Sequence, residues 1–230
     1  MKGYAAIDIL ADLSAALITH GLILRGGFSF RRDEDAPVGP GGEPAKSVLL
    51  VGQAGASVWP HFFRWRQTRL ADIHNPLDTW SREVIGEAAR RFGARAVFPF
   101  ERPFLPFQRW AMRAEGLKPS PLGILMHPEY GLWHAYRGAL LFDEELPLPQ
   151  SEAAVHLCDL CDGKPCLSAC PVGAYSEQGF AYEACLGHLR SGRGGTCMAA
   201  GCLARNACPY GQAYRYPPEV QAYHQSYFAR

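Results

Sequence analysis

Cysteine is absent from residues 1–157 of this 230-residue chain, and all eight cysteines lie beyond them. In the cytoplasm thiols stay reduced, so clustered cysteines there are more often metal ligands than disulfides. A chain of this length can bury a sizeable core, so it does not need metal or disulfides merely to fold. The distribution of cysteine therefore predicts two parts, of which only the second handles metal.

Long apolar runs and an excess of one charge are also missing. No window of about 18 residues is apolar and free of charge, which predicts no membrane span. Residues 1–21 contain Asp8 and Asp12 and lack a basic stretch and a cleavage site, which indicates an amphipathic helix and not a signal peptide. The net charge of +1 argues against strong binding to nucleic acid. These absences predict a cytoplasmic protein without nucleic-acid or membrane partners.

A Pro-rich stretch at 146–150 predicts a boundary between a domain at 1–150 and a second at 151–230. The first part mixes helices and strands without a βαβ rhythm or a Gly-rich phosphate fingerprint, so the expected class is α+β and not a dinucleotide fold. Expected helices cover 5–20, 76–92 and 106–115, and expected strands cover 22–30, 47–51, 94–98, 123–127 and 133–142. At the start of the middle helix, Asn75 can cap and Pro76 fits the first turn.

The first cysteine group is Cys158-x2-Cys161-x4-Cys166-x3-Cys170-Pro171. Bacterial ferredoxins contain C-x2-C-x2-C-x3-C-P, whose fourth cysteine ligates the other of two clusters. The present sequence departs from that run only by two extra residues before Cys166. A cubane needs thiolates from different directions, so the chain must wrap around it. The spacing therefore predicts a 4Fe-4S cluster.

The second group, Cys185-x11-Cys197-x4-Cys202-x5-Cys208-Pro209, is looser but also ends in Cys-Pro. The continuation from Cys170 to Tyr175 resembles the continuation from Cys208 to Tyr214, as expected of an internal duplication. Crossed ligation then predicts two sets. One cluster takes Cys158, Cys161, Cys166 and Cys208, and the other takes Cys170, Cys185, Cys197 and Cys202.

Two other interpretations of the cysteines stay open. Two zinc ions with four thiolates each would also use all eight cysteines and also accept Cys-x2-Cys spacing. The second interpretation is that the cysteines hold iron–sulfur clusters whose role is purely structural. The terminal Cys-Pro favours iron and sulfur over zinc.

A mixed α+β domain followed by a two-cluster module resembles the epoxyqueuosine reductases and the reductive dehalogenases. These families bind cobalamin beside their clusters. Within the first domain, residues 123–141 are similar to a segment of the cobalamin-processing protein CblC, in which His-Pro, Gly, Trp and Arg-Gly recur in the same order. Residues 75–78 and 218–223 also resemble that family. The resemblance implies a nitroreductase-like mixed sheet followed by a small ferredoxin-like module.

The same resemblance implies roles for individual residues. The side chains expected to line a cobalamin pocket are His127, Tyr130, Gly131, Trp133, Arg137 and Gly138. Arg137 matches an arginine that contacts glutathione in the CblC family, and Glu101 is an approximate match to the acidic proton donor of the epoxyqueuosine reductases. Ordinary alternatives are core packing for Tyr130 and Trp133, a buried histidine for His127, an ion pair for Arg137 and a solvated charge for Glu101.

The function predicted on this basis is reduction at cobalt. Electrons from a soluble donor would pass through two 4Fe-4S clusters to cobalamin, for processing the cofactor or for reducing a small substrate, and glutathione or another small molecule is an expected partner. Three alternatives stay open. One is a non-catalytic electron carrier with a docking domain, the second a flavin-binding reductase of the same fold, and the third a cobalamin chaperone whose clusters sense redox state.

Overall fold

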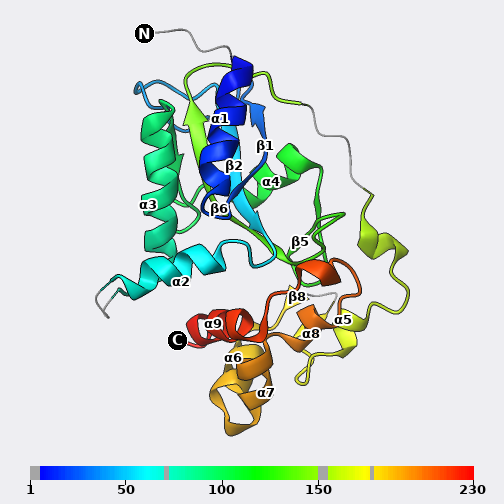
Figure 1. The fold of residues 1–230 in the computed structure, drawn as a ribbon. Helices are drawn as coiled ribbons and strands as arrows, with labels where there is room; N and C mark the ends of the chain where they lie inside the picture. Colours follow the sequence, from blue (N-terminus) through cyan, green and yellow to red (C-terminus); the bar gives the residue numbers. More distant parts are fainter. Residues whose placement is uncertain (1–5, 70–72, 150–154, 177–178) are drawn as a thin grey trace. The chain divides into compact units, whose positions relative to one another are not determined.

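The computed structural model describes residues 6–69, 73–149, 155–176 and 179–230, and it separates into two compact units (Figure 1). The described residues of Met1–Gly116 and Ala135–Ala153 form what we call the sheet unit. Those of Leu117–His134 and Ala154–Arg230 form the cysteine unit. The expected boundary near residue 150 is therefore incomplete, because the chain crosses between the units near residues 116 and 134 as well.

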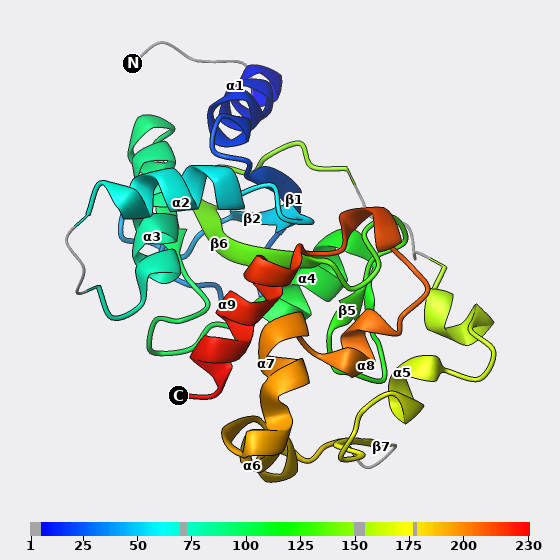
Figure 2. The same cartoon turned by 60° about the horizontal axis from the view of Figure 1, so that its bottom comes forward.

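The sheet unit is a four-stranded sheet with helices on both faces. Its elements are α1 (Ala6–Ile18), β1 (Ile23–Ser29), β2 (Ser47–Ala54), α2 (Trp59–Gln67), α3 (Pro76–Arg91), β3 (Arg95–Val97), α4 (Phe107–Glu115) and β6 (His134–Phe142). The strand order is β1-β2-β6-β3, with β1 antiparallel to β2 and β3 antiparallel to β6. α1 and α4 lie on opposite faces of the sheet (Figures 1 and 2). The predicted α+β class is confirmed.

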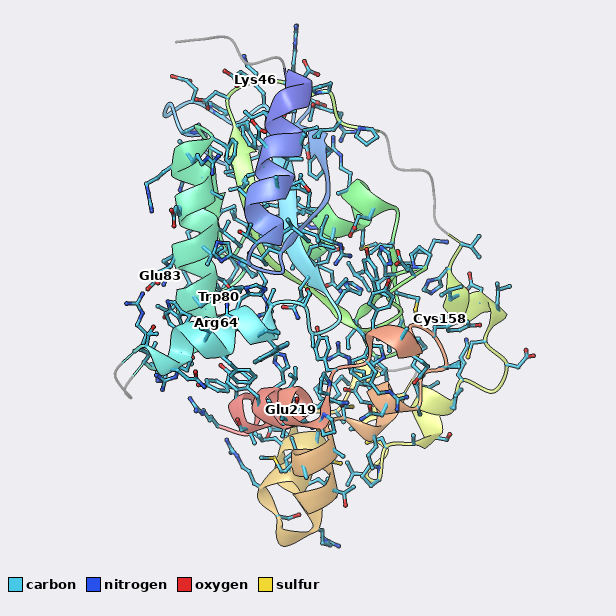
Figure 3. All side chains as sticks on the ribbon, viewed as in Figure 1. Lys46, Arg64, Trp80, Glu83, Cys158 and Glu219 are labelled. Atoms are coloured by element: carbon cyan, nitrogen blue, oxygen red, sulfur yellow. The ribbon has the colours of Figure 1, made fainter. Side chains whose placement is uncertain are left out.

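Helix α3 begins at the predicted proline, but its cap differs from the prediction. Asn75 makes no side-chain capping hydrogen bond, and its carbonyl oxygen instead accepts from the Thr79 hydroxyl at 3.0 Å. The buried face carries Trp80 (Figure 3), and the centroid of its ring lies 6.2 Å from that of Phe62 of α2. Helix α2 was not predicted, although Pro60 lies in its first turn, where proline is well tolerated.

The cysteine unit consists of short elements wound around two cavities. They are β4 (Lys118–Pro119), β5 (Leu125–Met126), η1 (Leu157–Leu160), α5 (Pro165–Ser168), β7 (Tyr175–Ser176), β8 (Gly179–Phe180), α6 (Tyr182–Arg190), η2 (Gly192–Gly194), α7 (Gly195–Ala200), α8 (Leu203–Asn206), η3 (Gln212–Tyr214) and α9 (Pro218–Phe228). β4 pairs with β5, and β7 with β8. α7 and α9 pack side by side (Figure 2).

Residues 117–134 belong with the cysteines because they supply apolar side chains to the core there. Leu122, Met126 and Leu132 are buried in one cluster with Cys158 and Cys208. A module restricted to residues after 150 would be close to the size at which a single hydrophobic core becomes marginal. The inserted segment therefore enlarges a small core.

Two glycine turns join residues 117–134 to the C-terminal part of the same unit. Gly131 and Gly211 both have positive φ, +57° and +68°, which glycine adopts at little cost. A Cβ on Gly131 would collide with the carbonyl oxygen of Tyr210, and one on Gly211 would collide with that of Tyr130. The two backbones thus touch directly, three residues from Cys208.

Within the described residues, no helix has the length and apolar character needed to cross a membrane.

Candidate metal centres

Four thiols line a small cavity in the cysteine unit, which we call the first cavity. They come from η1, from the residue after it, from α5 and from the Cys-Pro after α8, and they are Cys158, Cys161, Cys166 and Cys208. The walls include Pro121, Met126 and Leu132. Cys158 is labelled in Figure 3. The segment 117–134 therefore closes the cavity on one side.

The other four thiols line a separate small cavity in the same unit, the second cavity. They come from the Cys-Pro after α5, from α6, from α7 and from the residue before α8, and they are Cys170, Cys185, Cys197 and Cys202. Each cavity thus contains one thiol from the opposite sequence group, Cys208 in the first and Cys170 in the second. These are the two sets that crossed ligation predicts.

All eight cysteines are free thiols. In the part of the chain that the structure describes, no three His, Cys, Asp or Glu side chains converge closely enough to hold one metal ion. The thiols of each set line one shared cavity.

Burial, together with neighbouring cysteines, chiefly Cys208 and Cys202 respectively, raises the pKa of the Cys158 and Cys185 thiols to about 11. Four thiolates in one apolar cavity would repel each other and lose hydration. Neutral thiols are therefore favoured until a cationic group enters and binds thiolates. The donor set fits a soft, positively charged metal group.

The second cavity contains polar groups directed at its sulfur atoms. The Ala174 amide donates to Cys170 Sγ at 3.3 Å. The Tyr175 hydroxyl lies 3.9 Å from Cys202 Sγ, and His188 Nε2 lies 3.7 Å from Cys197 Sγ. Neither side chain was among the predicted site residues. The signals were present, since Tyr175 ends the Cys-Pro repeat and His188 lies one helical turn after Cys185.

Four of the predicted cofactor contacts lie in the cysteine unit and pack there. The His127 ring stacks on Tyr130 with centroids 4.0 Å apart, and its Nδ1 accepts from the amides of Glu129 and Tyr130 at 3.1 Å. Trp133 is fully buried beside Tyr216. Gly131 makes the glycine contact described above. These contacts explain the residues structurally, and their role toward cobalamin stays a prediction.

The other predicted residues lie in the sheet unit. Arg137 donates from Nε to Gln53 Oε1 at 2.9 Å. Gly138 leaves room for Ile85 and Phe98, because a Cβ there would come within 3.2 Å of both. The Glu101 carboxylate is 41% exposed and pairs with Arg82 at 3.1 Å. The structure therefore does not bring the six predicted cofactor residues into one unit, and the proton-donor role of Glu101 also stays a prediction.

A buried polar cluster in the sheet unit was not predicted. Arg25, whose side chain is 1% exposed, donates from Nε and Nη2 to both carboxylate oxygens of Glu115 at 2.8 and 2.9 Å. The Tyr136 hydroxyl donates to the same carboxylate. Burial raises the Tyr136 pKa, which keeps the hydroxyl protonated. The cluster joins β1, α4 and β6 and has the features of a structural ion pair.

Comparison with known proteins shows relationships of fold. No family model and no curated protein matches the chain in sequence. Its fold is similar to that of epoxyqueuosine reductase from Bacillus subtilis, with a TM-score of 0.54, 13% identity and coverage of 94% of this chain and 71% of that one. It is also similar to the C. elegans B12-trafficking protein CblC, a human MMACHC homologue, with a TM-score of 0.50, 9% identity and coverage of 95% and 92%.

Another similar structure is epoxyqueuosine reductase with an epoxyqueuosine-modified tRNA stem loop, with a TM-score of 0.51, 13% identity and coverage of 94% and 71%. The chain spans 52% to 71% of the length of the epoxyqueuosine reductases that it matches. Identities this low establish the fold alone, and they confirm the predicted resemblance at that level. A neighbour with bound tRNA does not support the expectation that nucleic acid is no partner, which stays a prediction for this chain.

Proposed function

We propose that this chain holds two 4Fe-4S clusters and delivers electrons from them to cobalamin. The observation that carries the proposal is the pair of four-thiol cavities, each of which draws one cysteine from the other sequence group. Crossed ligation of this kind is the pattern of two-cluster ferredoxins. When bound, the clusters would supply one-electron transfer.

The residues present fit such clusters, because cysteine thiolates are the usual ligands of 4Fe-4S clusters. Each cavity is lined by four thiols. Apolar walls such as Met126 and Leu132 in the first cavity and Leu189 and Leu203 in the second would limit the access of water. Exclusion of water and hydrogen bonds to sulfur are the means by which a protein adjusts a cluster's potential.

The cobalamin part of the proposal rests on the fold. The C. elegans neighbour is a B12-trafficking protein, and this chain covers 92% of its length. The sequence resemblance over 123–141 points to the same family. We assign reduction of bound cobalamin, for processing or for turnover of a small substrate, as the function that this combination supports best. The chain's own task would be to keep the clusters and the corrinoid in fixed positions.

Iron analysis of anaerobically purified and reconstituted protein tests the clusters. We expect about eight irons and eight sulfides per chain, with the broad visible absorption of iron–sulfur proteins. Zinc without visible absorption would refute the proposal.

Paired substitutions test the crossed sets. If the sets cross, Cys158→Ser with Cys208→Ser disrupts only one site and leaves about four irons, one cluster's content. Cys158→Ser with Cys170→Ser then disrupts both sites and loses nearly all iron. Sets that followed the sequence groups would reverse these two results. The pair of double variants therefore separates crossed from uncrossed ligation within the same chain.

A spectral titration with cobalamin tests the acceptor. We expect saturation near one cobalamin per chain and a shift of the cobalamin spectrum toward the form without its lower base. An unchanged spectrum, with no cobalamin retained on a sizing column, would contradict the acceptor and leave a ferredoxin-type carrier. A flavin spectrum in the purified protein would favour the flavin alternative.

A further inference from the structure

We infer that Tyr175 and His188 set the reduction potential of the second cluster by donating hydrogen bonds to its ligating sulfurs. This inference rests on the proposed clusters and concerns the second cavity only. Tyr175 and His188 both line that cavity, beside Cys202 and Cys197 respectively. Neither residue is a metal ligand in the proposed sets.

The direction of each hydrogen bond follows from ligation. A cysteine sulfur bound to iron is a thiolate, which can accept a hydrogen bond but has no proton to donate. The Tyr175 hydroxyl, 3.9 Å from Cys202 Sγ, must then be the donor. His188 Nε2, 3.7 Å from Cys197 Sγ, donates when that nitrogen carries the ring proton.

Both donors are held in place by the local structure. His188 lies on α6 three residues after Cys185, so the two side chains project from the same face of that helix. Tyr175 lies on β7 and stacks on Phe180 of β8, with ring centroids 4.8 Å apart. Donors fixed in this way can stabilise the added negative charge of a reduced cluster with little rearrangement.

The internal repeat supplies a contrast within the chain. Tyr214 follows the second Cys-Pro as Tyr175 follows the first, but its hydroxyl donates to Glu129. In the first set, the backbone amides of Leu167 and Tyr210 donate to the sulfurs of Cys166 and Cys208. Lys164 lines the first cavity but is exposed, so solvent and salt screen its charge. The two sites therefore differ in the means available to adjust potential.

Redox titration of the anaerobic, reconstituted chain, followed by electron paramagnetic resonance, tests the inference. The second cluster is identified as the signal that Cys185→Ser removes. We expect Tyr175→Phe and His188→Leu each to shift that potential to a more negative value, because removing a donor destabilises the reduced cluster. His188→Gln retains an amide donor and should shift the potential less than His188→Leu.

Tyr214→Phe is the matched control, and it should leave both potentials unchanged. Unchanged potentials in Tyr175→Phe and His188→Leu, with full iron content, would overturn the inference. So would equal shifts at both clusters, or loss of the second cluster from Tyr175→Phe, because these indicate a general structural role. Failure of the proposed function would appear separately, as wild-type protein without iron and sulfide.

Discussion

Replacement of Gly131 by alanine should weaken the first metal centre more than the second. Gly131 has a φ of +57°, and its Cα faces the carbonyl oxygen of Tyr210 without room for a Cβ. Tyr210 follows Cys208 and Pro209, so any displacement of that backbone moves a ligand of the first set. The cysteines of the second set lie farther along the chain from Tyr210 than Cys208 does, so this displacement should affect them less.

The expected cost has two parts. A side chain in the left-handed region costs roughly 1–2 kcal/mol. Forcing a methyl group into a filled space adds about 1–3 kcal/mol. The sum, roughly 2–5 kcal/mol, is a large part of the stability of a small unit. Gly123→Ala is the matched control, because Gly123 has a φ of +75° but open space around its Cα. Gly123→Ala should cost only the roughly 1–2 kcal/mol of placing a side chain in the left-handed region.

The assay is urea denaturation combined with iron content. We expect Gly131→Ala to lower the free energy of unfolding by more than Gly123→Ala does, and to lose iron first from the site that Cys208→Ser also empties. Equal costs for the two alanine variants would refute the close backbone contact. Loss of iron from both sites in parallel would refute the selective link to Cys208.

Three further predictions concern single groups. Glu115→Ala removes the carboxylate that pairs with the buried Arg25 and should cost about 3–5 kcal/mol, whereas Glu83→Ala, at an exposed pair, should cost at most about 1 kcal/mol, as measured by urea denaturation. Burial raises the pKa of Asp78 in the folded protein, so the fold is more stable when this carboxyl is protonated. That stabilisation is complete below the ordinary carboxyl pKa and is lost as pH rises through the pKa of Asp78 in the folded protein. Asp78→Asn should therefore match or exceed wild type in thermal stability at neutral pH and lose that advantage in acid. In iron-free chain, Cys158, with its pKa near 11, should react slowly with iodoacetamide at pH 8, and equally fast reaction at pH 8 and 11 would contradict that pKa.

Local sequence patterns predicted much of the fold. Pro76 and the apolar spacing that includes Trp80 and Ile85 placed α3 correctly, because helix start signals and a 3.6-residue period act over a few neighbouring residues. α2 was missed, since its nine residues carry aromatic side chains and two arginines without a clear polar face. The expected Asn75 cap was wrong, because the side-chain bond to the helix amides does not form.

The sequence by itself predicted the cysteine sets, because the two Cys-Pro motifs and crossed ligation assign each thiol to one cluster, and this assignment stays a prediction. Only the tertiary structure decided what surrounds them. Leu132 and Gly131 join the cysteine unit through burial and close backbone contact, which depend on residues some 80 positions away. The hydroxyl of Tyr175 reaches a sulfur while that of Tyr214 reaches Glu129, although both follow similar motifs. Such differences arise from packing between distant segments, which no local pattern specifies.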